Sequence, residues 1–136
     1  MNKPFLFSCI LCSLFVFIGG CSKPEVLSSV SGTVTFNGQP FPAGAGAVCF
    51  YSAEQDSSAR CTIQEGGKYV FPTPLPVGNY QVFISDPPAL GPPEPGAPPP
   101  RQPARVNFPD KYRSFETSGL TFRVEEGPNE FNINLE

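Results

Sequence analysis

Short runs of alternating apolar and polar residues recur between Val30 and Leu135, and glycine, proline or asparagine separates them. The clearest run covers residues 30–36, where serine and threonine occupy every second position. This period of two predicts a strand with one buried and one solvated face. Asn37 and Gly38 follow, and both tolerate the positive φ of a hairpin turn. No run has a helical period, so the pattern predicts an all-β domain.

The same reading predicts seven short strands, at residues 30–36, 47–52, 59–64, 68–71, 80–85, 119–125 and 131–135. Turn residues between them, such as Glu65-Gly66-Gly67, favour hairpin connections. The sequence therefore predicts a single seven-stranded antiparallel β-sandwich. Tyr69, Phe71, Tyr80 and Val82 are expected to belong to its core and rim. Phe108 and Tyr112 are expected to pack against the sandwich.

A proline-rich insertion interrupts the strand pattern at residues 87–103, PPALGPPEPGAPPPRQP, with nine prolines in seventeen residues. Proline has no amide hydrogen to donate, so the segment can join neither a ladder nor a helix, and polyproline II is expected. Two interpretations remain open. The insertion is either a solvated loop or an arm that an aromatic groove on another envelope protein recognises, through Pro98, Pro99, Pro100 and Arg101.

The N-terminal twenty residues have the parts of a secretory signal: Lys3, then a charge-free apolar run at residues 5–18. Ile18, Gly19, Gly20 and Cys21 end this run in the pattern of a lipoprotein cleavage box. The run is shorter than the roughly 20 residues that cross a bilayer. We expect residues 1–20 to be removed, residues 21–29 to form a lipidated tether, and residues 30–136 to form the domain. An ordinary, non-lipid signal peptide is the alternative.

Lipidation requires the thiol of Cys21, which carries a thioether-linked diacylglycerol, and the freed amine can take a third chain. Two or three acyl chains anchor a protein firmly, whereas one binds marginally. The membrane is therefore the first expected partner. Ser22 follows Cys21, where an aspartate would resemble an inner-membrane retention signal. The cell envelope is the expected location, with the outer membrane favoured over the inner one.

Composition argues against several functions. The chain carries 9 Lys and Arg against 12 Asp and Glu, and without a basic cluster we expect no nucleic-acid partner. It has no histidine, the commonest general base and metal ligand. No nucleophile elbow or phosphate-binding glycine loop is present, and the carboxylates lie in separate loops. We therefore predict no enzyme activity, no catalytic residues, no metal and no cofactor.

Cys49 and Cys61 lie on consecutive predicted strands and are the cysteines that remain beside Cys21 after cleavage. A disulfide between them is chemically permitted outside the cytoplasm. Alternation argues against it, because Cys49 points away from Val48 and Phe50 whereas Cys61 shares a face with apolar neighbours. The sequence leaves two alternatives open, a disulfide or two free thiols.

The segments VSGTVTFNGQPFPAGAGAVCFY and EGGKYVFPTPLPVGNYQVFIS resemble the carboxypeptidase regulatory-like, transthyretin-like sandwich domain. The tail FPDKYRSFETSGLTFRVEEGPNEFNINLE resembles a group of small bacterial lipoproteins built on that domain. The resemblance covers residues 30–135 apart from the insertion. It implies the fold and an envelope location, and it brings no catalytic residues. A purine-pathway hydrolase shares the fold, but its activity depends on histidines that this chain lacks.

Three functions follow in order of expectation. The first is a non-catalytic, lipid-anchored envelope β-sandwich that acts by adhesion or by contact with an envelope protein. The second is a small-ligand or glycan-binding module that uses an aromatic face around Phe41, Tyr51 and Phe83. The third is a hydrolase.

Overall fold

The computed structural model describes residues 25–87, 91, 95–96, 98 and 105–136. The expected cleavage box, Ile18 to Gly20, and the expected lipidation site, Cys21, lie outside the described residues. So do Pro99, Pro100 and Arg101 of the suggested recognition arm, whereas Pro98 is described. Within the described ranges, no helix is both long and apolar enough to cross a membrane.

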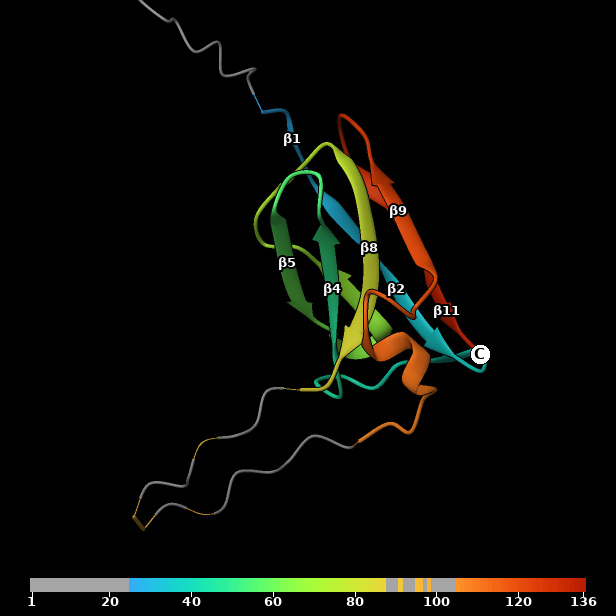
Figure 1. The fold of residues 1–136 in the computed structure, drawn as a ribbon. Coiled ribbons are helices and arrows are strands. Elements are labelled where there is room, and N and C mark those ends of the chain that lie inside the picture. Colours follow the sequence, from blue (N-terminus) through green and yellow to red (C-terminus); the bar gives the residue numbers. More distant parts are fainter. Residues whose placement is uncertain (1–24, 88–90, 92–94, 97, 99–104) are drawn as a thin grey trace, which may run out of the picture.

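One layer of the fold is a four-stranded antiparallel sheet with the order β5–β4–β8–β9 (Figure 1). Its strands are β5 (Ser57–Thr62), β4 (Ala47–Ser52), β8 (Gly78–Ser85) and β9 (Leu120–Val124). Alternate residues face the core, as in β8, where Tyr80, Val82 and Ile84 are buried. The expected period of two is thus confirmed here.

The second layer is organised around β2 (Val30–Phe36). On one edge, β6 (Lys68–Val70) and the two-residue β3 (Gln39–Pro40) pair with β2 in antiparallel orientation. On the other edge, β10 (Asn129–Glu130) and β11 (Ile133–Leu135) pair with it in parallel. A separate small ladder joins β1 (Leu27–Ser28) to β7 (Leu75–Pro76).

The fold is therefore all-β and sandwich-like, but it is not a single seven-stranded antiparallel structure. The strands form several sheets, and β10 and β11 run parallel to β2. A parallel pair needs a long crossover, and the whole intervening chain supplies it between β2 and β11. Alternation cannot predict this orientation, because the period of two is the same in both directions.

The core lies between the two layers, with the ring of Phe50 near its centre. The ring of Phe50 meets the rings of Phe71 at 5.0 Å and Tyr80 at 5.7 Å, measured between centroids. The predicted core residues are all buried, namely Tyr69, Phe71, Tyr80 and Val82. Phe108 and Tyr112 are buried as well, which confirms that the segment after the insertion packs onto the sandwich.

Several strand boundaries differ from expectation by one or two residues, and two of the differences have a clear cause. β5 covers residues 57–62, two residues earlier than predicted, because Ser57 and Ser58 pair with Ser52 and Tyr51 in a tight hairpin. The expected strand at residues 131–135 is interrupted between β10 and β11. There the side-chain oxygen of Asn132 accepts a hydrogen bond from the Thr33 amide at 3.0 Å, in place of a main-chain partner.

The chain enters the sandwich at one end and the insertion leaves it at the other (Figure 1). Leu27 of β1 pairs with Pro76 of β7, immediately before β8 begins at Gly78. β8 then runs to Ser85, beside the first residues of the insertion. Eight strand residues span about 25 Å. That length separates the N-terminal end of the domain from the base of the insertion.

Candidate functional site

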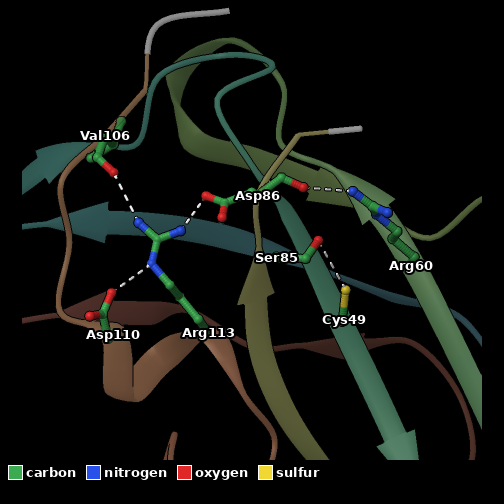
Figure 2. Close-up of polar contacts among 7 residues, drawn as sticks. All are labelled: Cys49, Arg60, Ser85, Asp86, Val106, Asp110 and Arg113. Carbon is green, nitrogen blue, oxygen red and sulfur yellow. Dashed lines mark hydrogen bonds and ion pairs between the residues drawn. The ribbon is translucent and has the colours of Figure 1, made fainter. Parts of the chain in front are cut away.

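Arg113 joins the two ends of the proline-rich insertion (Figure 2). Its guanidinium forms an ion pair with the Asp86 carboxylate at the first end and donates to the Val106 carbonyl oxygen, 3.5 Å away, at the second. It also pairs with Asp110 at 3.1 Å within η2 (Asp110–Arg113), and lies 4.2 Å over the Phe108 ring. A planar guanidinium with five donors suits such a junction.

Asp86 extends this junction to the edge of the four-stranded sheet. Its main-chain carbonyl oxygen accepts a hydrogen bond from the Arg60 guanidinium at 2.8 Å, while its side chain serves Arg113 (Figure 2). The base of the insertion is thereby tied to both β5 and η2. Asp86 and Val106, which flank the insertion, consequently have a defined position on the sandwich.

The outer face of the four-stranded sheet, which points away from the core, forms a regular grid. Arg60, Cys49 and Phe83 are partners in one row across β5, β4 and β8. The next row holds Ser58, Tyr51, Gln81 and Thr121, and Asn79 pairs with Arg123 in a third. Neighbouring strands lie about 4.8 Å apart, so aromatic, polar and cationic groups share one continuous surface.

Phe115, from the loop between η2 and β9, lies over this grid. Its ring centroid is 4.6 Å from that of Tyr51 and 6.2 Å from that of Phe83. A hollow of about 310 Å³ lies beside these rings, lined by Cys49, Tyr51, Ser58, Arg60, Phe83 and Phe115. We call it the aromatic hollow. It offers an apolar surface with a guanidinium at its rim.

A second hollow of about 360 Å³ adjoins the first and shares Tyr51 with it. Its polar lining comes from Glu54, Asn79, Gln81, Thr121 and Arg123. We call it the polar hollow. Each hollow lies within the usual size range of ligand pockets, which begins near 300 Å³.

The two cysteines are free thiols on opposite faces of the sheet. Cys49 pairs with Arg60, and Cys61 pairs with Val48, so strand alternation turns Cys49 outward and Cys61 toward the core. The structure thus has the arrangement of the free-thiol alternative, with the two cysteines on opposite faces as alternation indicated. The Cys61 thiol donates to the Val70 carbonyl oxygen at 2.9 Å.

Burial raises the pKa of the Cys49 thiol, although its hydrogen bond to the Ser85 hydroxyl and the charge of Arg60 act in the opposite direction. The Cys49 sulfur lies 3.5 Å from the Ser85 hydroxyl oxygen. A raised pKa leaves little thiolate near neutral pH, and the thiolate is the nucleophile. Cys49 lines the aromatic hollow. Because its pKa is raised, we expect its thiol to react slowly.

Of the three residues predicted for an aromatic face, Tyr51 and Phe83 belong to it and Phe41 does not. Tyr51 and Phe83 share the outer face, and Phe115 joins them. Phe41 is fully buried instead and meets the Phe108 ring at 5.6 Å. Phe41 follows the edge strand β3, where its amide donates to the Val34 carbonyl oxygen and turns the side chain into the core.

Sequence reasoning missed Phe115, Arg60, Arg123 and Arg113. Strand alternation could have found Arg60 and Arg123, because each occupies the same face of its strand as a polar neighbour. No local pattern could have found Phe115 or Arg113, since both follow the insertion and meet partners far away in the chain. Among the described residues, no group of three metal-ligating side chains occurs.

Comparison with known proteins gives a likeness in fold. No family model matches the chain, and no curated protein matches it. Among solved structures it is similar to a DUF3823 family protein from Parabacteroides merdae, with a TM-score of 0.52 and 16% sequence identity. The match covers 82% of this chain and 46% of that one, so the chain spans less than half of its structural neighbour. At this identity the likeness concerns the fold alone.

Proposed function

We propose that the chain is a lipid-anchored, non-catalytic module of the bacterial cell envelope that presents a binding surface away from the membrane. In this proposal it is a transthyretin-like, carboxypeptidase regulatory-like lipoprotein of the outer membrane, anchored through Cys21. The Ile18-Gly19-Gly20-Cys21 box and the strand motifs support that assignment. The absence of histidine from the sequence supports a role without catalysis.

One structural observation carries the proposal. Strand β1 and η2, which contains Arg113, lie at opposite ends of the sandwich, and β8 runs from one end to the other (Figure 1). A lipid on Cys21, four residues before Glu25, would hold the β1 end close to the membrane. The insertion would then leave the domain at the far end. An insertion at the end of the domain away from the membrane would be accessible to a partner protein.

The test compares cross-linking in intact envelopes between the natural chain and a variant in which residues 87–103 are replaced by a short glycine-serine turn. A specific cross-linked partner that disappears with the insertion is the expected result. Because Arg113, Asp86 and Val106 remain in the variant, the sandwich should fold, which circular dichroism checks. A partner that survives the replacement would move the binding surface to the sheets.

Palmitate labelling of a Cys21→Ser variant tests the anchor separately. The natural chain should incorporate label and pellet with membranes, and the variant should do neither. Label in the Cys21→Ser protein would contradict lipidation at this residue. Pelleting of the variant without label would point to a different mode of attachment.

The second candidate function is binding of a small ligand or glycan on the outer face of the four-stranded sheet. The adjoining aromatic and polar hollows, with Tyr51 between them, favour it. Tyr51→Ala should abolish any such binding in a glycan array, and Tyr51→Phe should retain most of it. A hydrolase remains third, because the sequence has no histidine to act as a general base beside a carboxylate.

A further inference from the structure

The outer face of the four-stranded sheet carries two arginines without an anionic partner. Among the described residues, ion pairs form only at Arg113. Arg60 donates to a main-chain carbonyl oxygen, that of Asp86, and Arg123 is exposed on β9. Both line hollows on this face. Arg123 shares the polar hollow with the exposed Glu54, but no ion pair joins these two among the described residues. Both guanidinium groups can therefore receive an anionic ligand.

The hollows between these arginines have the chemistry of a saccharide surface. The rings of Tyr51, Phe83 and Phe115 offer apolar area at the aromatic hollow. Asn79, Gln81 and Thr121 place exposed amide and hydroxyl groups along the polar hollow. Sugar rings present both C–H faces and hydroxyl edges, so they match apolar rings and planar polar groups set side by side.

The grid also gives the distance between the two cations. Arg60 on β5 and Arg123 on β9 are separated by three strand spacings, and their rows are four residues apart on β8. With about 4.8 Å between strands and 3.3 Å per residue, their Cα atoms lie about 20 Å apart. A monosaccharide cannot reach both arginines, whereas an oligosaccharide lying diagonally across the strands can.

We propose that this face binds an acidic oligosaccharide of the uronate type, with Arg60 and Arg123 each receiving one carboxylate. Guanidinium groups bind carboxylates through two parallel hydrogen bonds. Binding at these two arginines is therefore more specific than attraction by positive charge alone. Tyr51 lies between the hollows and supports the intervening sugar rings. The inference rests on the second candidate function, since it names the ligand class for that face.

The test measures binding of galacturonate oligomers of increasing length by titration calorimetry. Affinity should rise by about tenfold once an oligomer is long enough to reach both arginines. Arg123→Gln should remove that gain and leave the affinity for short oligomers unchanged. Arg60→Gln should weaken the binding of oligomers of every length, because Arg60 borders the aromatic hollow.

Lys68→Gln is the matched control, since it removes one positive charge from the exposed face of β6 in the other sheet. It should change no affinity. If Lys68→Gln weakens binding as much as Arg60→Gln, the attraction is a general charge effect and the proposal is wrong. Equal binding of poly-glutamate would also overturn it, because an acidic peptide would then be the partner.

Neutral oligomers of glucose separate failure of this inference from failure of the candidate function. If neutral and acidic oligomers bind equally and Tyr51→Ala abolishes both, the face binds saccharides but the acidic class is wrong. If no saccharide binds to the natural chain, this inference and the glycan form of the second candidate function are both wrong. The interaction module anchored at Cys21 would remain unaffected by either result.

Discussion

The Tyr69 hydroxyl donates a hydrogen bond of 2.6 Å to the main-chain carbonyl oxygen of Phe131. Phe131 lies in the gap between β10 and β11, where the parallel ladder on β2 is interrupted. The phenol of β6 thus reaches across β2 and satisfies a carbonyl group that the ladder leaves free. This bond connects the two edges of the β2 sheet and joins residues 62 positions apart in the chain.

Tyr69→Phe should lower the free energy of unfolding by about 1–2 kcal/mol at neutral pH, because it leaves the Phe131 carbonyl without that donor. Urea denaturation measures the change. The ring itself is retained, so the core packing around Phe71 should persist. A variant as stable as the natural chain would show that water replaces the phenol at no cost.

Stability at high pH provides a second readout for the same variant. Burial raises the pKa of Tyr69 above its usual value, with smaller contributions from Cys61 and Glu130, so folding favours the neutral phenol. The unfolded chain releases this proton near pH 10, and stability should fall as the pH rises further. Burial raises the pKa of Tyr80 as well. The stability of the Tyr69→Phe variant should therefore fall less steeply above pH 10 than that of the natural chain. The same dependence of stability on pH in both proteins would contradict this.

Gly32→Ala should prevent stable folding or cost several kcal/mol, because β2 and Phe131 approach too closely for a side chain. A Cβ at residue 32 would overlap the Phe131 carbonyl oxygen and lie 2.7 Å from its carbonyl carbon and 2.9 Å from the Tyr69 hydroxyl oxygen. Overpacking of this kind typically costs 1–3 kcal/mol and more where backbone must move. Thermal unfolding measures it. Gly91→Ala is the control, since nothing lies within 4 Å of a Cβ there.

Arg113→Lys should lower the free energy of unfolding by about 1 kcal/mol, because an ammonium group cannot serve Asp86, Asp110 and Val106 at once. Asp86→Asn should have a comparable effect. Asp110→Asn should have almost none, since the Asp110 side chain is 97% exposed. Equal effects of Asp86→Asn and Asp110→Asn would show that the contact with the insertion contributes nothing.

Thiol labelling of a chain shortened to residues 22–136, without reductant, should add two labels after unfolding, one each at Cys49 and Cys61. In the folded chain both should react slowly, because both are buried and burial raises the pKa of Cys49. The Cys49 rate should increase with pH beyond the usual thiol range. Intact mass gives the count, and an absence of labels in the unfolded chain would establish a disulfide instead.

The all-β class could be predicted from the sequence because alternation and turn residues act locally. Residues such as Val30 and Val34 recur at the period of a strand, and they are buried. The same alternation predicted that Cys49 and Cys61 lie on opposite faces of the sheet. The aromatic face was only partly predictable, since Tyr51 and Phe83 follow the rule of alternation and Phe41 lies beyond the end of an edge strand.

Local pattern carries no information about which distant segments meet. Neighbouring residues are enough to predict most of the strands, to mark the apolar run that ends at Cys21 and to locate the proline-rich interruption, because each of these patterns spans only a few residues. The parallel pairing of β11 with β2, the contact of Phe115 with Tyr51 and the ion pair of Arg113 with Asp86 become visible only in the folded chain. Each of these is a contact between segments far apart in the chain, and such contacts form only when the two layers close around a shared core.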